Sequence, residues 1–173
     1  MSEPVKAEDV VLRRAREADA KAMADYMAAL TAERLDTITP REAPSVEDER
    51  DWVLQAHFAE RGLLLLAEVG DEVVGILDFW GGERPDNKHA GFFGMSVAKA
   101  WRGRGLGRRM LQWVIDEAQD WPGFCRIELE CVAWNAPAIG LYESLGFKIE
   151  GRMVKAINLR GTPEDMLVMA LPW

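Results

Sequence analysis

The segment Arg102-Gly103-Arg104-Gly105-Leu106-Gly107-Arg108 lies between a predicted strand that ends near Val97 and a predicted helix that begins near Gly105. The first turn of a helix presents unpaired N–H groups and about half a positive charge, which favours a phosphate group. Glycines let a ligand approach the backbone closely, and arginines add charge and fork-shaped hydrogen bonding. The sequence therefore predicts that this segment, which we call the glycine turn, binds a pyrophosphate.

The glycine turn alone leaves other interpretations open. A nucleotide P-loop would end in Gly-Lys-Ser/Thr, and the segment has no such ending. A dinucleotide fingerprint would read Gly-x-Gly-x-x-Gly near the first strand, whereas Gly103, Gly105 and Gly107 follow Gly-x-Gly-x-Gly and come late in the chain. A glycine-rich segment that only connects a strand to a helix remains an equal alternative at this point.

The rest of the chain predicts an α/β fold. Continuous or alternating apolar runs predict strands, and apolar residues at helical spacing predict helices. We expect strands at 10–14, 63–69, 73–80, 89–97, 127–132, 149–157 and 166–171, and helices at 17–31, 45–58, 105–118 and 135–145. Ser45, with Asp48 three residues later, predicts a capping box. Strands that first pair as hairpins and then alternate with helices predict a mixed sheet with helices on both faces.

Length and composition predict one cytoplasmic domain over residues 1–173. The 173 residues are 49% hydrophobic, so the core needs neither a metal nor a disulfide. Cys125 and Cys131 lie too far apart along one predicted strand to form a bridge, and reduced thiols fit the cytoplasm. Met1–Val10 has no apolar signal segment, and runs such as Leu63–Ala67 are too short to span a membrane.

The charge is unevenly distributed along the chain. The net charge of −8 disfavours nonspecific binding to nucleic acid or to an anionic membrane. Residues 87–115 nevertheless contain no Asp or Glu, and their basic residues are Lys88, Lys99, Arg102, Arg104, Arg108 and Arg109. A small cationic region in an acidic protein fits one compact anionic ligand, and a solvated basic face is the alternative.

Two motifs in order resemble the GCN5-related N-acetyltransferases (GNAT). Their acetyl-CoA loop reads Arg/Gln-x-x-Gly-x-Gly/Ala, and Arg102, Gly105 and Gly107 occupy those positions after Gly94-Met95-Ser96-Val97. The later segment Asn135-Ala136-Pro137-Ala138-Ile139-Gly140-Leu141-Tyr142-Glu143-Ser144-Leu145-Gly146-Phe147 is similar to their Asn-x-x-Ala-x-x-Leu-Tyr-x-x-x-Gly-Phe segment. The resemblance extends along nearly the whole chain. It implies a mostly antiparallel sheet of six or seven strands that splays between the fourth and fifth strands.

The resemblance also implies where acetyl-CoA binds. The pantetheine arm would lie between strands 89–97 and 127–132 and pair with the backbone of Met95 and Val97, as an added strand pairs with an exposed edge. The implied cofactor-binding residues are Met95, Ser96, Val97, Arg102, Gly103, Arg104, Gly105, Leu106, Gly107, Arg108, Asn135 and Tyr142. A backbone N–H near the thioester would stabilise the oxyanion of a tetrahedral intermediate. Asn135 is in addition expected to cap its helix.

Direct attack by an amine requires a proton donor for the thiolate and an acceptor for the ammonium proton. Tyr142, in the family's Leu-Tyr pair, is the expected proton donor. The alternative is that Tyr142 only packs in the hydrophobic core. Glu130 is the candidate base. The alternatives are Glu128, His89, Glu33 and a chain of water molecules.

The acceptor is an amine that the motifs do not define. The resemblance places specificity at Thr31–Pro44 and Arg152–Met166, and the C-terminus is similar to a branch that includes ribosomal-protein, polyamine and amino-acid acetyltransferases. Acids in these segments would attract a cationic amine: Glu33, Asp36, Glu42, Glu164 and Asp165. Trp80 and Phe92 would form an apolar wall. A small amine, an amino acid and a peptide N-terminus all stay open, as does a homodimer. A CoA-binding sensor or partner domain with little activity is the second functional hypothesis.

Overall fold

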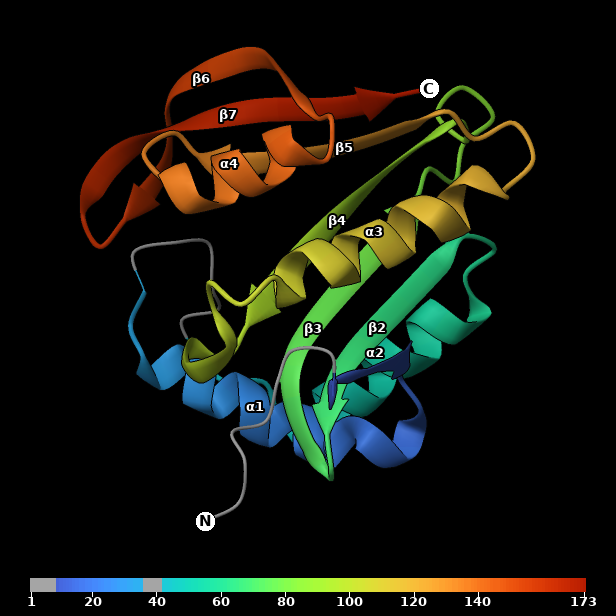
Figure 1. Ribbon diagram of the computed structural model, residues 1–173, viewed down its shortest axis with the longest axis vertical. Coiled ribbons are helices and arrows are strands. Elements are labelled where there is room, and N and C mark those ends of the chain that lie inside the picture. The colour runs from blue at the N-terminus through green and yellow to red at the C-terminus, as the bar shows by residue number, and fades with distance from the viewer. Residues whose placement is uncertain (1–8, 36–41) are drawn as a thin grey trace.

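The computed structural model describes residues 9–35 and 42–173, which form a seven-stranded sheet with helices on both faces (Figure 1). The elements are β1 (Val11–Arg14), η2 (Glu17–Asp19), α1 (Ala20–Ala32), α2 (Val46–Phe58), β2 (Gly62–Val69), β3 (Glu72–Gly81), β4 (Ala90–Val97), η3 (Lys99–Trp101), α3 (Leu106–Gln119), β5 (Arg126–Val132), α4 (Ala136–Ser144), β6 (Lys148–Leu159) and β7 (Thr162–Pro172). Met1–Val10, in which no signal segment is expected, lies largely outside the described residues, and Asp36 of the expected loop lies wholly outside them.

The strand order is β1-β2-β3-β4-β5-β7-β6, and every neighbouring pair is antiparallel except β4–β5. These two strands pair in parallel over three residues only, Ala90–Phe92 with 126–128. Beyond Phe92 they diverge, and this confirms the predicted splay between the fourth and fifth strands. The sheet is therefore open at its centre, where the carboxyl halves of β4 and β5 separate.

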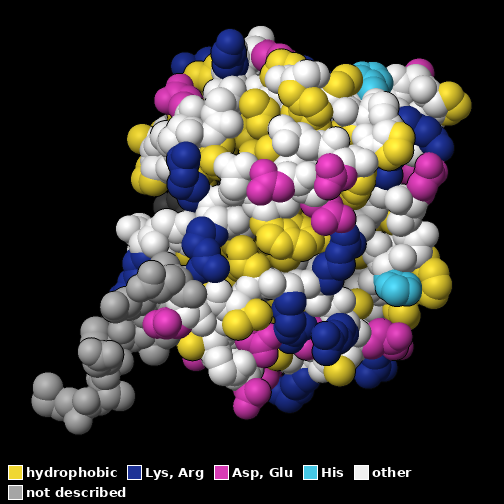
Figure 2. Space-filling model, turned by 45° about the vertical axis from the view of Figure 1, so that its right-hand side comes forward, with side chains coloured by type: hydrophobic (Ala, Val, Ile, Leu, Met, Phe, Trp, Pro, Cys, Tyr) yellow, Lys and Arg dark blue, Asp and Glu magenta, His cyan; other side chains and the backbone are white. Residues whose placement is uncertain are grey.

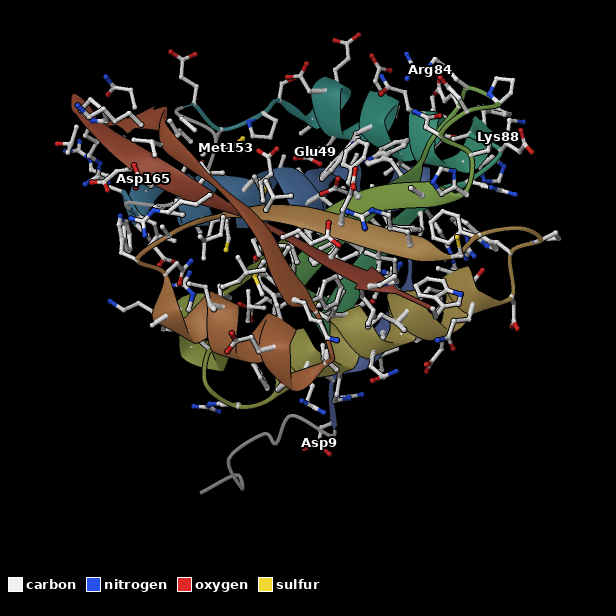
Figure 3. All side chains as sticks on the ribbon, turned by 90° about the horizontal axis from the view of Figure 1, so that it is seen from above. Asp9, Glu49, Arg84, Lys88, Met153 and Asp165 are labelled. Atoms are coloured by element: carbon white, nitrogen blue, oxygen red, sulfur yellow. The ribbon has the colours of Figure 1, made fainter. Side chains whose placement is uncertain are left out.

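Two hydrophobic cores lie on opposite faces of the sheet. On one face, α1 and α2 pack through residues such as Met23 and Val53 onto Leu64 and Leu66; on the other, α3 packs through residues such as Met110 onto Leu65. The alternation of side chains along β2 explains why consecutive leucines are all buried. Figure 3 shows α1 and α2 on one side of the sheet and α3 and α4 on the other. Below we call these the α1–α2 face and the α3–α4 face.

A local signal in the sequence explains where α2 begins. Ser45 Oγ accepts a hydrogen bond from the backbone N–H of Asp48 at 3.1 Å, and Asp48 Oδ2 accepts one from the N–H of Ser45 at 2.8 Å. This confirms the capping box that begins α2. None of the helices within the described ranges has the length and apolar character that a membrane span requires.

The clearest difference from the sequence prediction is at β7, which begins at Thr162 instead of 166. It pairs with β6 through a tight turn at Arg160 and Gly161, both of which have positive φ. The first residues of β7 are exposed or half-buried, so they lack the apolar alternation by which strands are found. Cys125 precedes β5 and is exposed, Cys131 is buried within it, and both are free.

Candidate active site

A cavity of about 790 Å³ lies at the splay between β4 and β5. Its lining comes from α1, α2, β3, β4, the glycine turn, α3, β5 and α4, so it has walls on both faces of the sheet. The splay explains this, because a sheet with continuous hydrogen bonding would separate the two faces. The predicted residues that line the cavity are Met95, Ser96, Val97, Arg102, Gly103, Gly105, Leu106, Gly107, Arg108, Glu130, Asn135 and Tyr142.

The glycine turn leads directly into α3. Gly103 and Gly105 have φ values of 70° and 81°, a region that glycine adopts without strain, and Gly105 is the residue that caps α3. A Cβ atom on either would meet no atom within 4 Å, so the surface above them is open. A Cβ atom on Gly107 would instead lie 3.3 Å from Leu141 and 3.4 Å from Met95, because α3 packs closely against α4 and β4 there.

The arginines of the turn are held by protein groups. Arg102 donates from Nε to the carbonyl of Val97 at 2.8 Å, and its Nη atoms contact the carboxylate of Glu33 at 2.7 and 3.0 Å. Arg108 donates to Ser144 Oγ at 2.5 Å. Arg104 lies over the ring of Trp101 at 5.5 Å and is not part of the cavity lining. Arg102 thus ties the end of β4 to the end of α1.

The predicted cationic region is not continuous in space. Lys88 lies away from the cavity and contacts Glu60 at 2.9 Å. On the face shown in Figure 2, Asp and Glu side chains lie above a central hydrophobic patch, and Lys and Arg side chains lie at its sides and below it. The basic residues that are close in sequence are therefore separated in the structure: several belong to the glycine turn, whereas Lys88 is a surface residue paired with Glu60.

Tyr142 enters the cavity from α4. Its ring lies 5.8 Å from Phe93 and 6.1 Å from Phe147, which fixes it against the α3–α4 core. Burial raises the pKa of Tyr142 to about 12, and the nearby Cys131 adds to the rise. The phenol is therefore protonated at any ordinary pH and available as a proton donor. Asn135 caps α4 by accepting a hydrogen bond from the N–H of Ala138 at 3.4 Å.

The structure distinguishes among the four predicted base candidates. Glu130 lines the cavity from β5. Glu128 lies outside the lining and contacts Arg126 at 3.1 Å, and Glu33 is engaged with Arg102. His89 precedes β4 at the end far from the glycine turn. Only Glu130 of these four is part of the cavity wall.

The sequence analysis missed Asp78, an acidic residue of β3 that lines the cavity. Trp80 Nε1 donates a hydrogen bond to Asp78 Oδ2 at 2.9 Å. Burial raises the pKa of Asp78, although hydrogen bonds from Trp80 and from the N–H groups of Asp78 and Gly94 oppose the rise. The available signal was a single acid within the apolar run Val73–Trp80.

The residues expected at the acceptor wall do not line this cavity. Trp80 and Phe92 are not part of the lining, and no described residue of Arg152–Met166 is either. Glu164 and Asp165 lie on the β6–β7 hairpin, where Asp165 contacts Arg152 at 2.7 Å. The apolar wall consists of other side chains on the α1–α2 face: Met27, Leu30, Leu35, Trp52 and Ile76.

The match to known proteins agrees with this geometry. The acetyltransferase (GNAT) family matches residues 25–147, which include the splay, the glycine turn and Tyr142. The chain belongs to this family. The sequence resemblance is thereby confirmed, as are the GNAT fold and the enzyme class, an acyltransferase.

Two curated relatives resemble this GNAT enzyme. The L-amino acid N-acetyltransferase AaaT from Escherichia coli is 34% identical over 122 residues, which cover 69% of this chain and 75% of the relative. The ribosomal protein bS18-alanine N-acetyltransferase from Salmonella typhimurium is 40% identical over 83 residues, 48% of this chain and 55% of the relative. The chain thus matches about half the length of the ribosomal-protein enzyme.

Solved structures share the fold at low identity. A GNAT-family acetyltransferase from Streptococcus pneumoniae has a TM-score of 0.88 at 22% identity, over 95% of this chain and 99% of that chain. The acetyltransferase yncA from Salmonella typhimurium, solved with its cofactor acetyl-CoA, has a TM-score of 0.83 at 23% identity, over 95% and 94% of the two chains.

Proposed function

We propose that this GNAT enzyme transfers the acetyl group of acetyl-CoA to a primary amine by direct attack through a tetrahedral intermediate. One observation carries the proposal: a single cavity joins the glycine turn and Tyr142 on the α3–α4 side with carboxylates on the α1–α2 side. Donor and acceptor then meet within the splay without a covalent enzyme intermediate. The names of the curated relatives, which act on L-amino acids and on a ribosomal-protein alanine, support an amine acceptor.

The cofactor is proposed to bind through backbone groups. Its pyrophosphate lies against the N–H groups of Gly103–Gly107, where α3 begins and the dipole of a 14-residue helix favours negative charge. Its pantetheine arm follows Met95–Val97, the part of β4 that β5 leaves unpaired. The carbonyl of Val97 already accepts a hydrogen bond from Arg102. Arg102 therefore acts mainly by holding this strand end and the turn in place.

Proton transfers are proposed to occur from both sides of the sheet. Tyr142 donates a proton to the departing thiolate, and Glu130 lines the side from which the amine approaches. Ser96 Oγ, near the thioester position, accepts a hydrogen bond from Tyr26 at 2.9 Å. This bond links β4 to α1 and fixes the serine side chain on the acceptor side.

The test measures thiol release from acetyl-CoA with a panel of amines, alongside the affinity for CoA. The proposal expects amine-dependent release and an N-acetylated product by mass spectrometry. Tight CoA binding without release on small amines, amino acids or peptides with a free N-terminus would contradict it and favour a sensor role.

A further inference from the structure

Asp78 and Glu130 are the acidic residues among the described cavity lining, and both are on the α1–α2 face. Side chains alternate along a strand. Leu77 and Phe79 pack in the α3 core while Ile76 packs with α1 and α2, so Asp78 shares the face of Ile76. Leu129 and Cys131 pack in the α3 core. By the same alternation, the side chain of Glu130, which lies between them in the sequence, is on the other face of the sheet. Two carboxylates therefore flank β4 on the side away from Tyr142.

Asp78 is positioned against the strand that leads to the proposed thioester position. It pairs in register with Gly94, and a Cβ atom at Gly94 would lie only 2.7 Å from Asp78 Oδ1. Any side chain at residue 94 would displace the carboxylate. Trp80 holds the other oxygen, Oδ2, at 2.9 Å. The carboxylate is thus fixed beside the residue that immediately precedes Met95.

No cationic side chain of the described residues forms an ion pair with Asp78, although it is largely buried. Carboxylates removed from water are normally paired with a cation or protonated, because an unpaired buried charge is costly. The cationic residues of the described lining are Arg102 and Arg108, and both belong to the glycine turn. A cationic ligand on the acceptor side would supply the missing partner.

The remaining acceptor wall is apolar. Met27, Leu30 and Leu35 contribute from α1 and the segment after it, Trp52 from α2 and Ile76 from β3. These side chains offer an apolar surface to a substituent of the amine. A carboxylate next to the amine would face the negative charges of Asp78 and Glu130, and Arg102, the cation near this side, is already paired with Glu33.

We propose that Asp78 binds the ammonium group of the acceptor and accepts a proton from it, and that the acceptor is a primary amine with an apolar substituent and no carboxylate beside the nitrogen. The inference rests on the proposed function and adds the acceptor class to it. It differs from the L-amino acids in the name of the Escherichia coli relative.

Two protons leave the ammonium nitrogen during the reaction. The ammonium gives one proton to the Asp78 carboxylate, which later releases it to solvent, and the neutral nitrogen forms a bond with the thioester carbon. The carbon–sulfur bond then breaks, and the thiolate takes the proton of the Tyr142 hydroxyl. The second proton leaves nitrogen as the amide forms and restores the Tyr142 phenol. The products are the acetylated amine, free CoA thiol and one proton.

The electrostatic surroundings suit this role. Burial raises the pKa of Asp78, which makes its carboxylate a better proton acceptor. The other titratable groups near the acceptor side are Glu130, the hydroxyl of Tyr26 and the Glu33–Arg102 pair. Burial raises the pKa of Tyr26 to about 12, so its hydroxyl stays neutral and does not compete for the proton.

The first experiment compares Asp78→Asn with wild type, using 2-phenylethylamine and acetyl-CoA. We expect kcat/KM for the amine to fall about 100-fold or more, with unchanged CoA affinity. The loss should shrink at high pH, where the amine is already neutral in solution. Asparagine retains the shape of the side chain and an oxygen for the bond from Trp80. A melting temperature at least equal to that of wild type would exclude misfolding. Asp78→Ser is the second variant. Activity within twofold of wild type at neutral pH would overturn the role of Asp78.

The second experiment compares three acceptors on the wild-type enzyme: 2-phenylethylamine, L-phenylalaninamide and L-phenylalanine. We expect the first two to exceed L-phenylalanine in kcat/KM by about tenfold or more; equal or reversed values would overturn the acceptor class. A wild-type enzyme that releases no thiol with any amine would overturn the proposed function. Turnover that survives the Asp78 variants would overturn this inference alone.

Discussion

The two faces of the sheet are built by different means. The α3–α4 side of the cavity offers accessible backbone beside side chains such as Leu141 and Tyr142: two glycines with positive φ, the start of α3 and the unpaired edge of β4. The α1–α2 side consists of individual side chains from α1, α2, β3 and β5. Under the proposed function, the cofactor is bound mainly by backbone groups, whereas separate side chains select the acceptor. The predictions below test this division, from the largest expected effect to the smallest.

The backbone side is tested most directly by Gly105→Asp. An anion at this position would face the pyrophosphate, and its side chain would require a strained positive φ. We expect the affinity for acetyl-CoA to fall by at least about 100-fold, or about 2.7 kcal/mol, by isothermal titration calorimetry. The matched control is Gly161→Asp, at an equally open glycine with φ 90° in the β6–β7 turn. Equal losses in both variants would count against the glycine turn.

Tyr142→Phe separates chemistry from binding on the same side. The ring contacts with Phe93 and Phe147 remain, so the melting temperature and the CoA affinity should stay near wild type. We expect kcat to fall about 100-fold because the thiolate loses its proton donor. Since the pKa of Tyr142 is about 12, the wild-type rate should not decline through its ionisation below about pH 11. An unchanged kcat would make the phenol a packing residue.

Glu49 tests the stability of the acceptor side. This residue of α2 is 1% exposed, and burial raises its pKa to about 7 (Figure 3). A raised pKa in the folded state gives stability that is full below the unfolded pKa and lost as pH rises through 7. Glu49→Gln should therefore stabilise the protein by about 1–3 kcal/mol at pH 8 and hardly at all at pH 4.

Urea unfolding at the two pH values measures this difference. The control is Glu47→Gln, an exposed acid in the first turn of the same helix, which should not stabilise the protein at either pH. A Glu49 effect that is independent of pH would show that its charge is not the cause.

The smallest effect is expected at the contact between the two sides. Glu33→Gln removes the charge that holds Arg102, while the bond from Arg102 to Val97 can remain. Because partly exposed ion pairs contribute about 0–1 kcal/mol, we expect acetyl-CoA affinity to fall less than about fivefold. A gain in affinity would instead mean that Arg102, once released, contacts the phosphates.

The same division explains how much the sequence could predict. Gly103, Gly105 and the Asn135–Phe147 segment are local patterns, so the glycine turn and the capped helix α4 were predicted from contiguous residues. The splay was implied by the family resemblance that these segments carry. Asp78, Trp52 and Met27 come from three elements far apart in sequence, and only the folded sheet and helices bring them to one wall. In the sequence, Asp78 is a single acid within an apolar strand, and only the pairing of β3 with β4 places it beside Gly94.

The sequence also could not predict which side chains contact the charged residues. Glu33 was one of the alternatives to Glu130 as the base, but it contacts Arg102, which lies 69 residues away in the chain. Trp80 was expected to line the acceptor wall, yet its ring nitrogen holds Asp78. In both cases the residue type was informative, and its role depended on a contact that no local pattern encodes.

The short ladder between β4 and β5 has a consequence for the empty and loaded enzyme. Strands β1–β4 are joined to β5–β7 by three paired residues at the start of β4, and the rest of β4 makes no pairs with β5. Under the proposed function, the pantetheine amides supply the missing rungs along β4. The cofactor is then a temporary eighth strand as well as an acyl donor, and each catalytic cycle completes the sheet on loading and reopens it when CoA departs.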